Sequence, residues 1–171
     1  MVMNKDFLSE LFKPKGRFIL EHIRQGKVIA QYDMPNGIVN EGKTDILDVY
    51  FSDASQTASS SWYIGLIDSS GYTALNDADV MSSHSGWNEF TSYSEANRVA
   101  WGPGAASGQS ITNGTPATFN ISGSGTLKGI FVVTNNTKSG TSGTLWATAL
   151  FSADVPVSNG DQLRVTYTVS A

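Results

Sequence analysis

The stretch that most constrains this chain is residues 62–67, from Trp62 to Ile67, where apolar residues follow one another almost without a break. Successive side chains of a strand point to opposite faces, so this segment is apolar on both of its faces. It ends at residues 68–71, a combination typical of a turn. A strand that is apolar on both faces is buried on both faces. The sequence therefore predicts a folded β-protein around this strand.

Beyond Ser52, short apolar or alternating runs recur between breaks rich in glycine, serine and asparagine. This pattern is typical of a β-sandwich or jelly roll and not of alternating strands and helices. Strands are expected at residues 62–67, 87–93, 97–101, 115–122, 126–135, 144–151 and 161–169. In the last of these, apolar residues alternate with polar ones from Leu163 to Val169, which predicts one buried and one wet face.

The breaks between these strands are interpreted as turns and loops within one domain. Asn113-Gly114 and Asn159-Gly160 mark tight turns. Residues 122–125 and 139–143 are rich in glycine and serine like linkers, but each lies between strong strand candidates. We therefore expect exposed loops there and no domain boundary.

The first part of the chain predicts a hairpin. Two strand candidates, residues 17–24 and 27–33, flank Gln25-Gly26, where glycine can supply positive φ. Residues 35–37, Pro-Asn-Gly, are expected to form the next turn.

One substantial helix is predicted, at about residues 43–51. Its apolar residues recur with the i, i+1, i+4, i+5 spacing of a single helical face: Ile46, Leu47, Tyr50 and Phe51. A helix with one apolar face is expected to pack that face on the core.

A second, shorter helix is predicted at residues 5–12, before the Pro14-Lys15-Gly16 stop. Its apolar residues also lie at helical spacing: Phe7, Leu8, Leu11 and Phe12. Two turns of helix are marginal alone, so the segment must dock either on its own β-domain or on a neighbouring subunit. The expected organisation is an amino-terminal arm, helical or extended, at 1–15 and a β-sandwich domain at 16–171. The four apolar residues are candidate interface residues.

Composition excludes several classes of function. The 171 residues include no cysteine, so neither a disulfide framework nor the common structural zinc sites are expected. Net charge is −4, and charged residues make up 15% of the chain against about 25% in an ordinary domain. Nucleic acid is not an expected partner, because phosphate binding needs clustered cations. Neither a secretory signal nor a membrane span is expected, because no apolar run is long enough.

Candidate chemistry is sparse. The densest reactive segment runs from Asp79 to Gly86, but it has no Gly-x-Ser-x-Gly elbow. We expect His84 to cap a turn or to bond the backbone, and His22 to be an ordinary half-exposed strand residue. Asp77, Asp79 and Glu89 could hold a hard cation or form a glycosidase pair, but the fixed offsets of a calcium loop are absent. No catalytic, cofactor-binding or metal-binding residue is predicted, and no enzyme.

The four tryptophans are Trp62, Trp87, Trp101 and Trp146. Large aromatic residues most often build cores or interfaces. Trp101, beside Gly102-Pro103-Gly104, is the best candidate for exposure, either in a protein interface or as a platform on which a sugar stacks.

Several motifs resemble those of one family over nearly the full length of the chain. They are Gly16–Phe18, Asn36–Gly42, Ile46–Val49, Trp62–Asp68, His84–Phe90, Gly129–Phe131 and Gly143–Phe151. With them, the chain resembles small structural proteins of tailed bacteriophages that serve as capsid decoration, or cement, proteins. The segments around Trp62 and Trp87 together are the more specific part of the resemblance, and the segment through Phe12 is the least matched.

The resemblance implies a non-enzymatic protein with a β-sandwich or jelly-roll fold, a homo-trimer seated on the outer surface of the capsid. Its partner would be the major capsid protein, and its location the virion after synthesis in the host bacterial cytoplasm. The resemblance supplies no catalytic motif. The alternative is a phage tail or fibre component that binds a host-surface glycan through Trp101.

Overall fold

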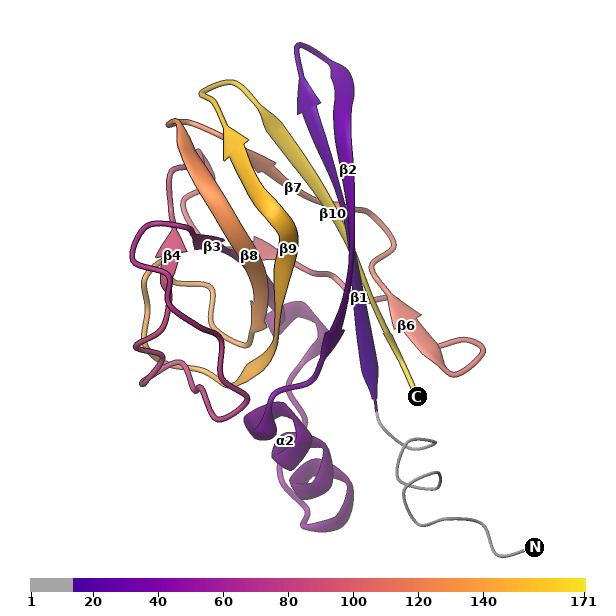
Figure 1. The fold of residues 1–171 in the computed structure, drawn as a ribbon. Coiled ribbons are helices and arrows are strands. Elements are labelled where there is room, and N and C mark those ends of the chain that lie inside the picture. Colours follow the sequence, from indigo (N-terminus) through magenta and orange to yellow (C-terminus); the bar gives the residue numbers. More distant parts are fainter. Residues whose placement is uncertain (1–13) are drawn as a thin grey trace, which may run out of the picture.

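The computed structural model describes residues 14–171, which form two five-stranded antiparallel sheets packed as a sandwich (Figure 1). The first sheet contains β2 (Lys27–Gly37), β1 (Lys15–Arg24), β10 (Gln162–Ser170), β6 (Ser110–Thr112) and β7 (Ala117–Asn120). The second contains β4 (Asn88–Phe90), β3 (Tyr63–Asp68), β8 (Gly125–Val133), β9 (Leu145–Val157) and β5 (Val99–Ala100). One α-helix, α2 (Asn40–Phe51), and a short 3₁₀ turn, η1 (Ser59–Ser61), complete the described part. The predicted mostly-β sandwich with one helix is confirmed.

The predicted arm helix at residues 5–12, with Phe7, Leu8, Leu11 and Phe12, lies outside the described residues.

Every predicted strand region contains a strand, with three differences. β6 was not predicted, and β9 continues to Val157. The turn expected at residues 35–37 is wrong, because these residues pair with β1 as the end of β2. Proline is tolerated there since β2 lies at the edge of its sheet, where one side of the strand needs no ladder hydrogen bonds.

The predicted hairpin between β1 and β2 is confirmed. Gln25 and Gly26 have φ angles of 52° and 76°, the two successive positive values of the tight turn that matches strand twist. The turn at Asn159-Gly160 is also confirmed, with Gly160 at φ 90°. Residues 113–114 lie in the connection between β6 and β7. Residues 122–124 and 139–143 lie between strands as loops, whereas Gly125, expected in the first of these loops, begins β8.

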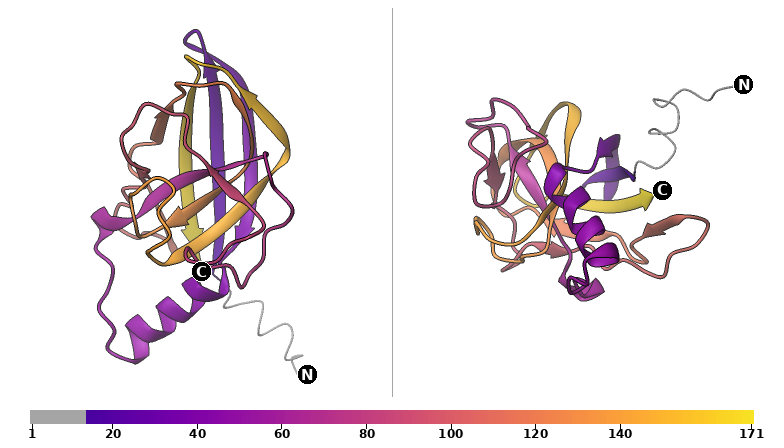
Figure 2. Two further views of the ribbon diagram at one scale, coloured as in Figure 1. Left: turned by 90° about the vertical axis from the view of Figure 1, so that its left-hand side faces the viewer. Right: turned by 90° about the horizontal axis from the view of Figure 1, so that it is seen from below.

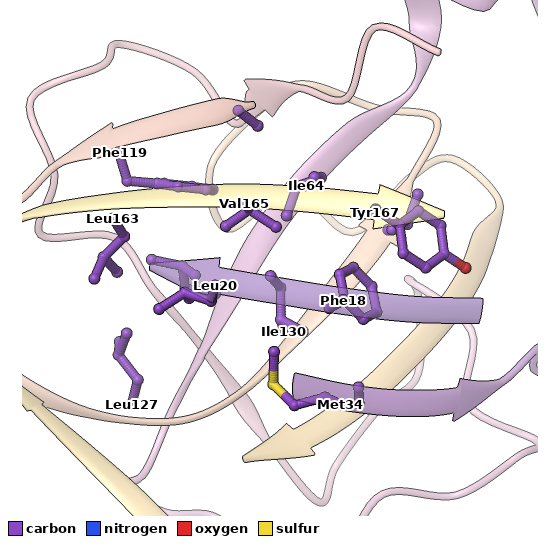
Figure 3. Packing of buried hydrophobic residues seen from close by; sticks show 14 of the residues in the cluster. Phe18, Leu20, Met34, Ile64, Phe119, Leu127, Ile130, Leu163, Val165 and Tyr167 are labelled. Atoms are coloured by element: carbon purple, nitrogen blue, oxygen red, sulfur yellow. The ribbon is translucent and has the colours of Figure 1, made fainter. Parts of the chain in front are cut away.

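The main core lies between the sheets (Figure 3). On β10, Leu163, Val165 and Tyr167 are fully buried, while Arg164 on the opposite face is exposed, as the alternation predicts. Tyr167 stacks on Phe18 of β1 with ring centroids 4.1 Å apart. Aromatic stacking of this kind adds to the stabilisation that burial gives.

A second apolar cluster covers the other face of the second sheet. Ile64 and Leu66 of β3 point into the main core, whereas Ile67 belongs to the second cluster. The connection between β3 and β4 covers this face with Met81 and Trp87. β3 is therefore buried on both faces, as its sequence predicts.

Gly65 has a specific role in this second cluster. A Cβ atom at Gly65 would lie within 2.4 Å of ring atoms of Phe131, its partner on β8. The Phe131 ring therefore occupies the space where a side chain would stand, and only glycine leaves room for it.

A buried polar cluster joins β1 to the turn between β9 and β10. His22, expected to be half-exposed, is 3% exposed, so that expectation is wrong. Its Nε2 lies 2.7 Å from Oδ2 of Asp161. Asp161 also accepts hydrogen bonds from Arg24 Nε at 2.7 Å and from the Ser158 backbone N–H at 2.8 Å. Burial of His22 is tolerated because Asp161, which is distant in the sequence, provides a hydrogen-bond partner for its imidazole ring.

The guanidinium of Arg24, followed by the Ser158 N–H and His22, holds the pKa of Asp161 well below its ordinary value, against the opposing effect of burial. A carboxyl whose pKa is lower in the folded chain stabilises the fold above the unfolded pKa, about 4. That stabilisation is lost as pH falls through the folded value.

We predict that Asp161→Asn lowers the free energy of unfolding by about 3 kcal/mol at pH 7, because a buried acceptor of three donors is replaced by a neutral amide. Urea denaturation followed by fluorescence measures this. The difference from wild type should shrink on acidification below about pH 4. The control is Asp33→Asn, which removes the exposed pair with Arg17 and should leave the urea midpoint unchanged. Equal effects of the two changes would contradict the prediction.

Candidate interaction surface

The first turn of α2 is fixed to the second sheet. Its entry is held by the backbone N–H of Val39, which donates to the carbonyl of Trp146 at 3.1 Å. The Glu41 side chain accepts a hydrogen bond from the Leu145 N–H at 2.7 Å. Gly42 is the buried residue of the helix, and an added Cβ would lie 2.7 Å from the Trp146 carbonyl oxygen. The start of α2 is therefore pressed directly against the backbone of β9.

The rest of α2 projects away from the sandwich (Figure 2). Leu47, Tyr50 and Phe51 are 56%, 80% and 77% exposed. Ile46, half-buried, packs against the main core. The predicted helix is confirmed in place, and Ile46 packs on the core as expected, but the same expectation is wrong for Leu47, Tyr50 and Phe51. The reason is geometric, because α2 meets the sandwich with its first turn and its later turns extend beyond the sheets.

A groove of about 900 Å³ lies between α2 and the end of the first sheet. Its walls are mainly apolar, and they include Pro14, Gly16, Pro35, Ile38, Ile46 and Leu47. The start of β1, the end of β2 and the carboxyl-terminal residue Ala171 meet at this end of the sandwich. The exposed residues Leu47, Tyr50 and Phe51, together with this groove, are called the α2 surface below.

The acidic groups of α2 line a pocket beside Val80 and Thr144 that is separate from the groove. Glu41, Asp45 and Asp48 lie on the helix, against a single lysine, Lys43. Burial, and then the neighbouring charge of Asp48, raise the pKa of Asp45 above its ordinary value. No basic residue lies in the last turn of α2, where the helix dipole favours a cation. The groove itself is lined by Lys15 and Lys43 and by no acidic residue, so the α2 surface suits a partner that is mainly apolar.

Trp101 does not lie on the surface, so the expectation that it is exposed is wrong. It is 5% exposed, and its Nε1 donates to the Tyr167 carbonyl at 2.9 Å. Its ring packs edge-on against Trp62, with centroids 6.5 Å apart. Trp101 therefore joins the two sheets, and its ring is not free to stack on a sugar or a protein partner. Trp87 and Trp146 are buried, as predicted for core aromatics.

The segment from Asp79 to Gly86 has a structural role. Asp79 accepts a hydrogen bond from Trp87 Nε1 at 3.0 Å. His84 stacks on Trp87 with centroids 3.9 Å apart, and its Nδ1 lies 3.1 Å from the Trp87 carbonyl oxygen. The expectation that His84 bonds the backbone in a loop is confirmed. These side chains hold Trp87 over the second sheet.

Glu89 is engaged in a buried ion pair that the sequence did not reveal. Arg98 donates to its two carboxylate oxygens at 3.0 and 2.8 Å, and the side chains are 0% and 4% exposed. Glu89 also accepts from the Ser139 N–H at 2.7 Å. The sequence signal for this ion pair was Arg98, a charged residue inside the strand expected at residues 97–101. Within residues 14–171, no three His, Cys, Asp or Glu side chains gather as a metal site would require.

We predict that Gly42→Ala destabilises the protein by about 1–3 kcal/mol, because the new methyl group meets the Trp146 carbonyl at the point where α2 docks. Helix propensity alone would favour alanine by about 1 kcal/mol, so the sign is diagnostic. Chemical denaturation measures it. The matched control is Gly37→Ala, where an added Cβ has no atom within 4 Å and which should be neutral. A more stable Gly42→Ala protein would show that α2 is not held at this contact.

Over residues 14–171, no helix has the length and apolarity that crossing a membrane requires. No known protein family matches the chain, and a search of the curated proteins finds no match. The resemblance to phage decoration proteins therefore stays a prediction.

Proposed function

We propose that this protein is a non-enzymatic capsid decoration protein of a tailed bacteriophage, which binds the outer surface of the major capsid shell and stabilises it. The observation that carries the proposal is the α2 surface. Exposed groups of large apolar residues mark sites of protein–protein contact. The resemblance of the chain to decoration proteins supplies the identity of the partner.

The polar groups of the sandwich support a binding role over a catalytic one. The strongest candidates for chemistry are Asp79, His84, Glu89 and Asp161, and each is engaged by neighbouring side chains or backbone in a contact that holds the fold together. A catalytic acid or base needs a free bonding position that faces a substrate. The α2 surface, by contrast, offers exposed apolar side chains for contact with a partner.

The exposed residues of α2 are sufficient to matter energetically. Burying one large apolar side chain contributes about 1.5–3 kcal/mol. A homo-trimer around a three-fold axis, as proposed here, would present three α2 surfaces to the shell together. Linked contacts of this kind raise the overall affinity well above that of one surface. Binding to the assembled shell then favours it over the open shell by mass action.

The alternative of a glycan-binding tail or fibre component has lost the feature that motivated it, because Trp101 is buried. The proposed location is the capsid surface of the virion.

We predict that purified virions contain on the order of hundreds of copies of this protein, since a closed symmetric shell repeats its binding site many times. Quantitative mass spectrometry against the major capsid protein measures the ratio. A handful of copies per particle would place the protein elsewhere in the virion and contradict the proposal.

We also predict that Phe51→Ser weakens binding to shells that lack the protein by about tenfold or more, because one buried aromatic residue is lost from the contact. Co-sedimentation with such shells measures the affinity. The matched control is Ile29→Ser, also an exposed apolar residue, near the tip of the β1–β2 hairpin at the opposite end of the sandwich (Figure 1). Shell binding lost with Ile29→Ser and kept with Phe51→Ser would show that the other end of the molecule makes the contact.

A further inference from the structure

We propose that the groove of the α2 surface binds an amphipathic helix of a partner protein, one with acidic residues beside its apolar face. The source of this helix, the capsid shell, rests on the proposed function, whereas the fit between groove and helix follows from the groove alone. Three features carry the inference: the spacing of apolar residues along α2, the strand ends opposite α2, and the charge on the two sides of α2.

The first feature is an apolar stripe along the groove side of α2. Ile46 and Leu47 belong to the groove wall, and the exposed Tyr50 continues their line toward the end of the helix. With Lys43, which also lines the groove, they occupy positions i, i+3, i+4 and i+7. Residues at this spacing share one face, since successive helix positions are rotated by about 100°. A stripe of this kind packs against the side of a second helix.

The second feature is the wall opposite α2, which is made of strand ends. Pro14 and Pro35 stand in this wall. Proline has no N–H, so neither residue donates the ladder hydrogen bond that an added strand needs. A helix satisfies its own backbone groups and brings mainly side chains to the contact. The groove therefore favours a helix over an extended segment, as in other complexes where an apolar groove receives the anchors of a helix.

The third feature is the difference in charge between the two sides of α2. Lys15 and Lys43 line the groove, and its lining has no acidic side chain. Asp45 and Asp48 line the separate pocket together with Glu41, and they lie about 140–160° around the helix from Lys43. A carboxylate of the partner is therefore attracted to the groove and repelled from the pocket. The charges thus select the side of α2 on which the partner binds.

The apolar stripe and the two lysines have different parts in recognition. Lys15 and Lys43 are exposed, and exposed ion pairs contribute little to affinity. Burial of Leu47 and Tyr50 removes apolar surface from water and supplies the affinity. Complementary charge instead distinguishes one partner from another and fixes its register. An acidic amphipathic helix is therefore preferred over a basic one of the same apolar pattern.

A pair of synthetic peptides tests this preference without a shell. Both are helix-forming probes of about 16 residues with leucine at i, i+3, i+4 and i+7. One has glutamate beside this face, and the other has lysine at the same positions. We expect the full-length protein to bind the glutamate probe about fivefold more tightly or better, as measured by fluorescence anisotropy. Because the protein has a net charge of −4, non-specific attraction favours the lysine probe, so the expected preference is diagnostic.

Three variants show whether the groove is responsible. Lys43→Glu should abolish the preference, whereas the matched control Lys27→Glu, at the start of β2, should keep it. Tyr50→Ser should weaken binding of the glutamate probe by about tenfold, because a buried aromatic residue is lost. Equal binding of the two probes, or a preference that survives Lys43→Glu, would overturn the proposal. So would loss of self-association with Tyr50→Ser in analytical ultracentrifugation, because a second copy would then fill the groove.

Photo-cross-linking to shells that lack the protein identifies the partner helix. A photoreactive phenylalanine analogue replaces Leu47 in the test protein and Asp45, about 160° around the helix, in its control. We expect position 47 to cross-link a segment of the major capsid protein with apolar residues at helical spacing beside Asp or Glu, as identified by mass spectrometry. A lysine-rich segment, or stronger cross-linking from position 45, would overturn the proposal. Probes that bind as expected, with no binding of the wild-type protein to shells, would instead count against the proposed function.

Discussion

The structure depends on the burial of the second sheet on both of its faces. β3 contributes Ile64 and Leu66 to the core between the sheets and Ile67 to the cluster on the outer face. Exposing an apolar outer face to water is unfavourable, so another part of the chain has to cover it. The connection between β3 and β4 does so, and its conformation is set by Trp87, which packs on Phe131 with ring centroids 5.0 Å apart.

This requirement accounts for the side chains that at first suggest chemistry. A tryptophan buried under a loop needs a hydrogen-bond acceptor for its indole N–H, and Asp79 provides it. His84 then covers the exposed side of the same ring. Glu89 and Arg98 fasten the neighbouring loop at Ser139 in a similar way. Asp79 and His84 lie close together in the sequence because both hold Trp87 over the second sheet. Their proximity therefore does not require a substrate.

The features predictable from the sequence are those determined by local pattern. Gln25-Gly26 predicted its hairpin because the two positive φ angles of the turn depend on these two residues alone. The apolar pattern on both faces of residues 62–67 predicted a strand that is buried on both faces. The features not predictable depend on distant partners. His22 is buried because Asp161, 139 residues away, satisfies it. Trp101 is buried because the Tyr167 carbonyl, 66 residues away, accepts its N–H. An apolar stripe such as that of α2 likewise specifies a helix but not the surface that it meets.

The two ends of the sandwich differ in what they leave unsatisfied. At the end near the β9–β10 turn, His22, Arg24 and Asp161 satisfy one another within the fold. At the other end, α2 holds aromatic side chains in water, in a protein with only 15% charged residues to keep it dispersed. Such exposure promotes non-specific association unless something covers it. Gly42 fits α2 closely against β9, so the projecting helix is built into the fold and is not a frayed end. Val28 and Ile29 are also exposed, at the β1–β2 turn, but α2 holds the exposed aromatic residues, and a fixed apolar projection of this kind implies that a definite surface completes it.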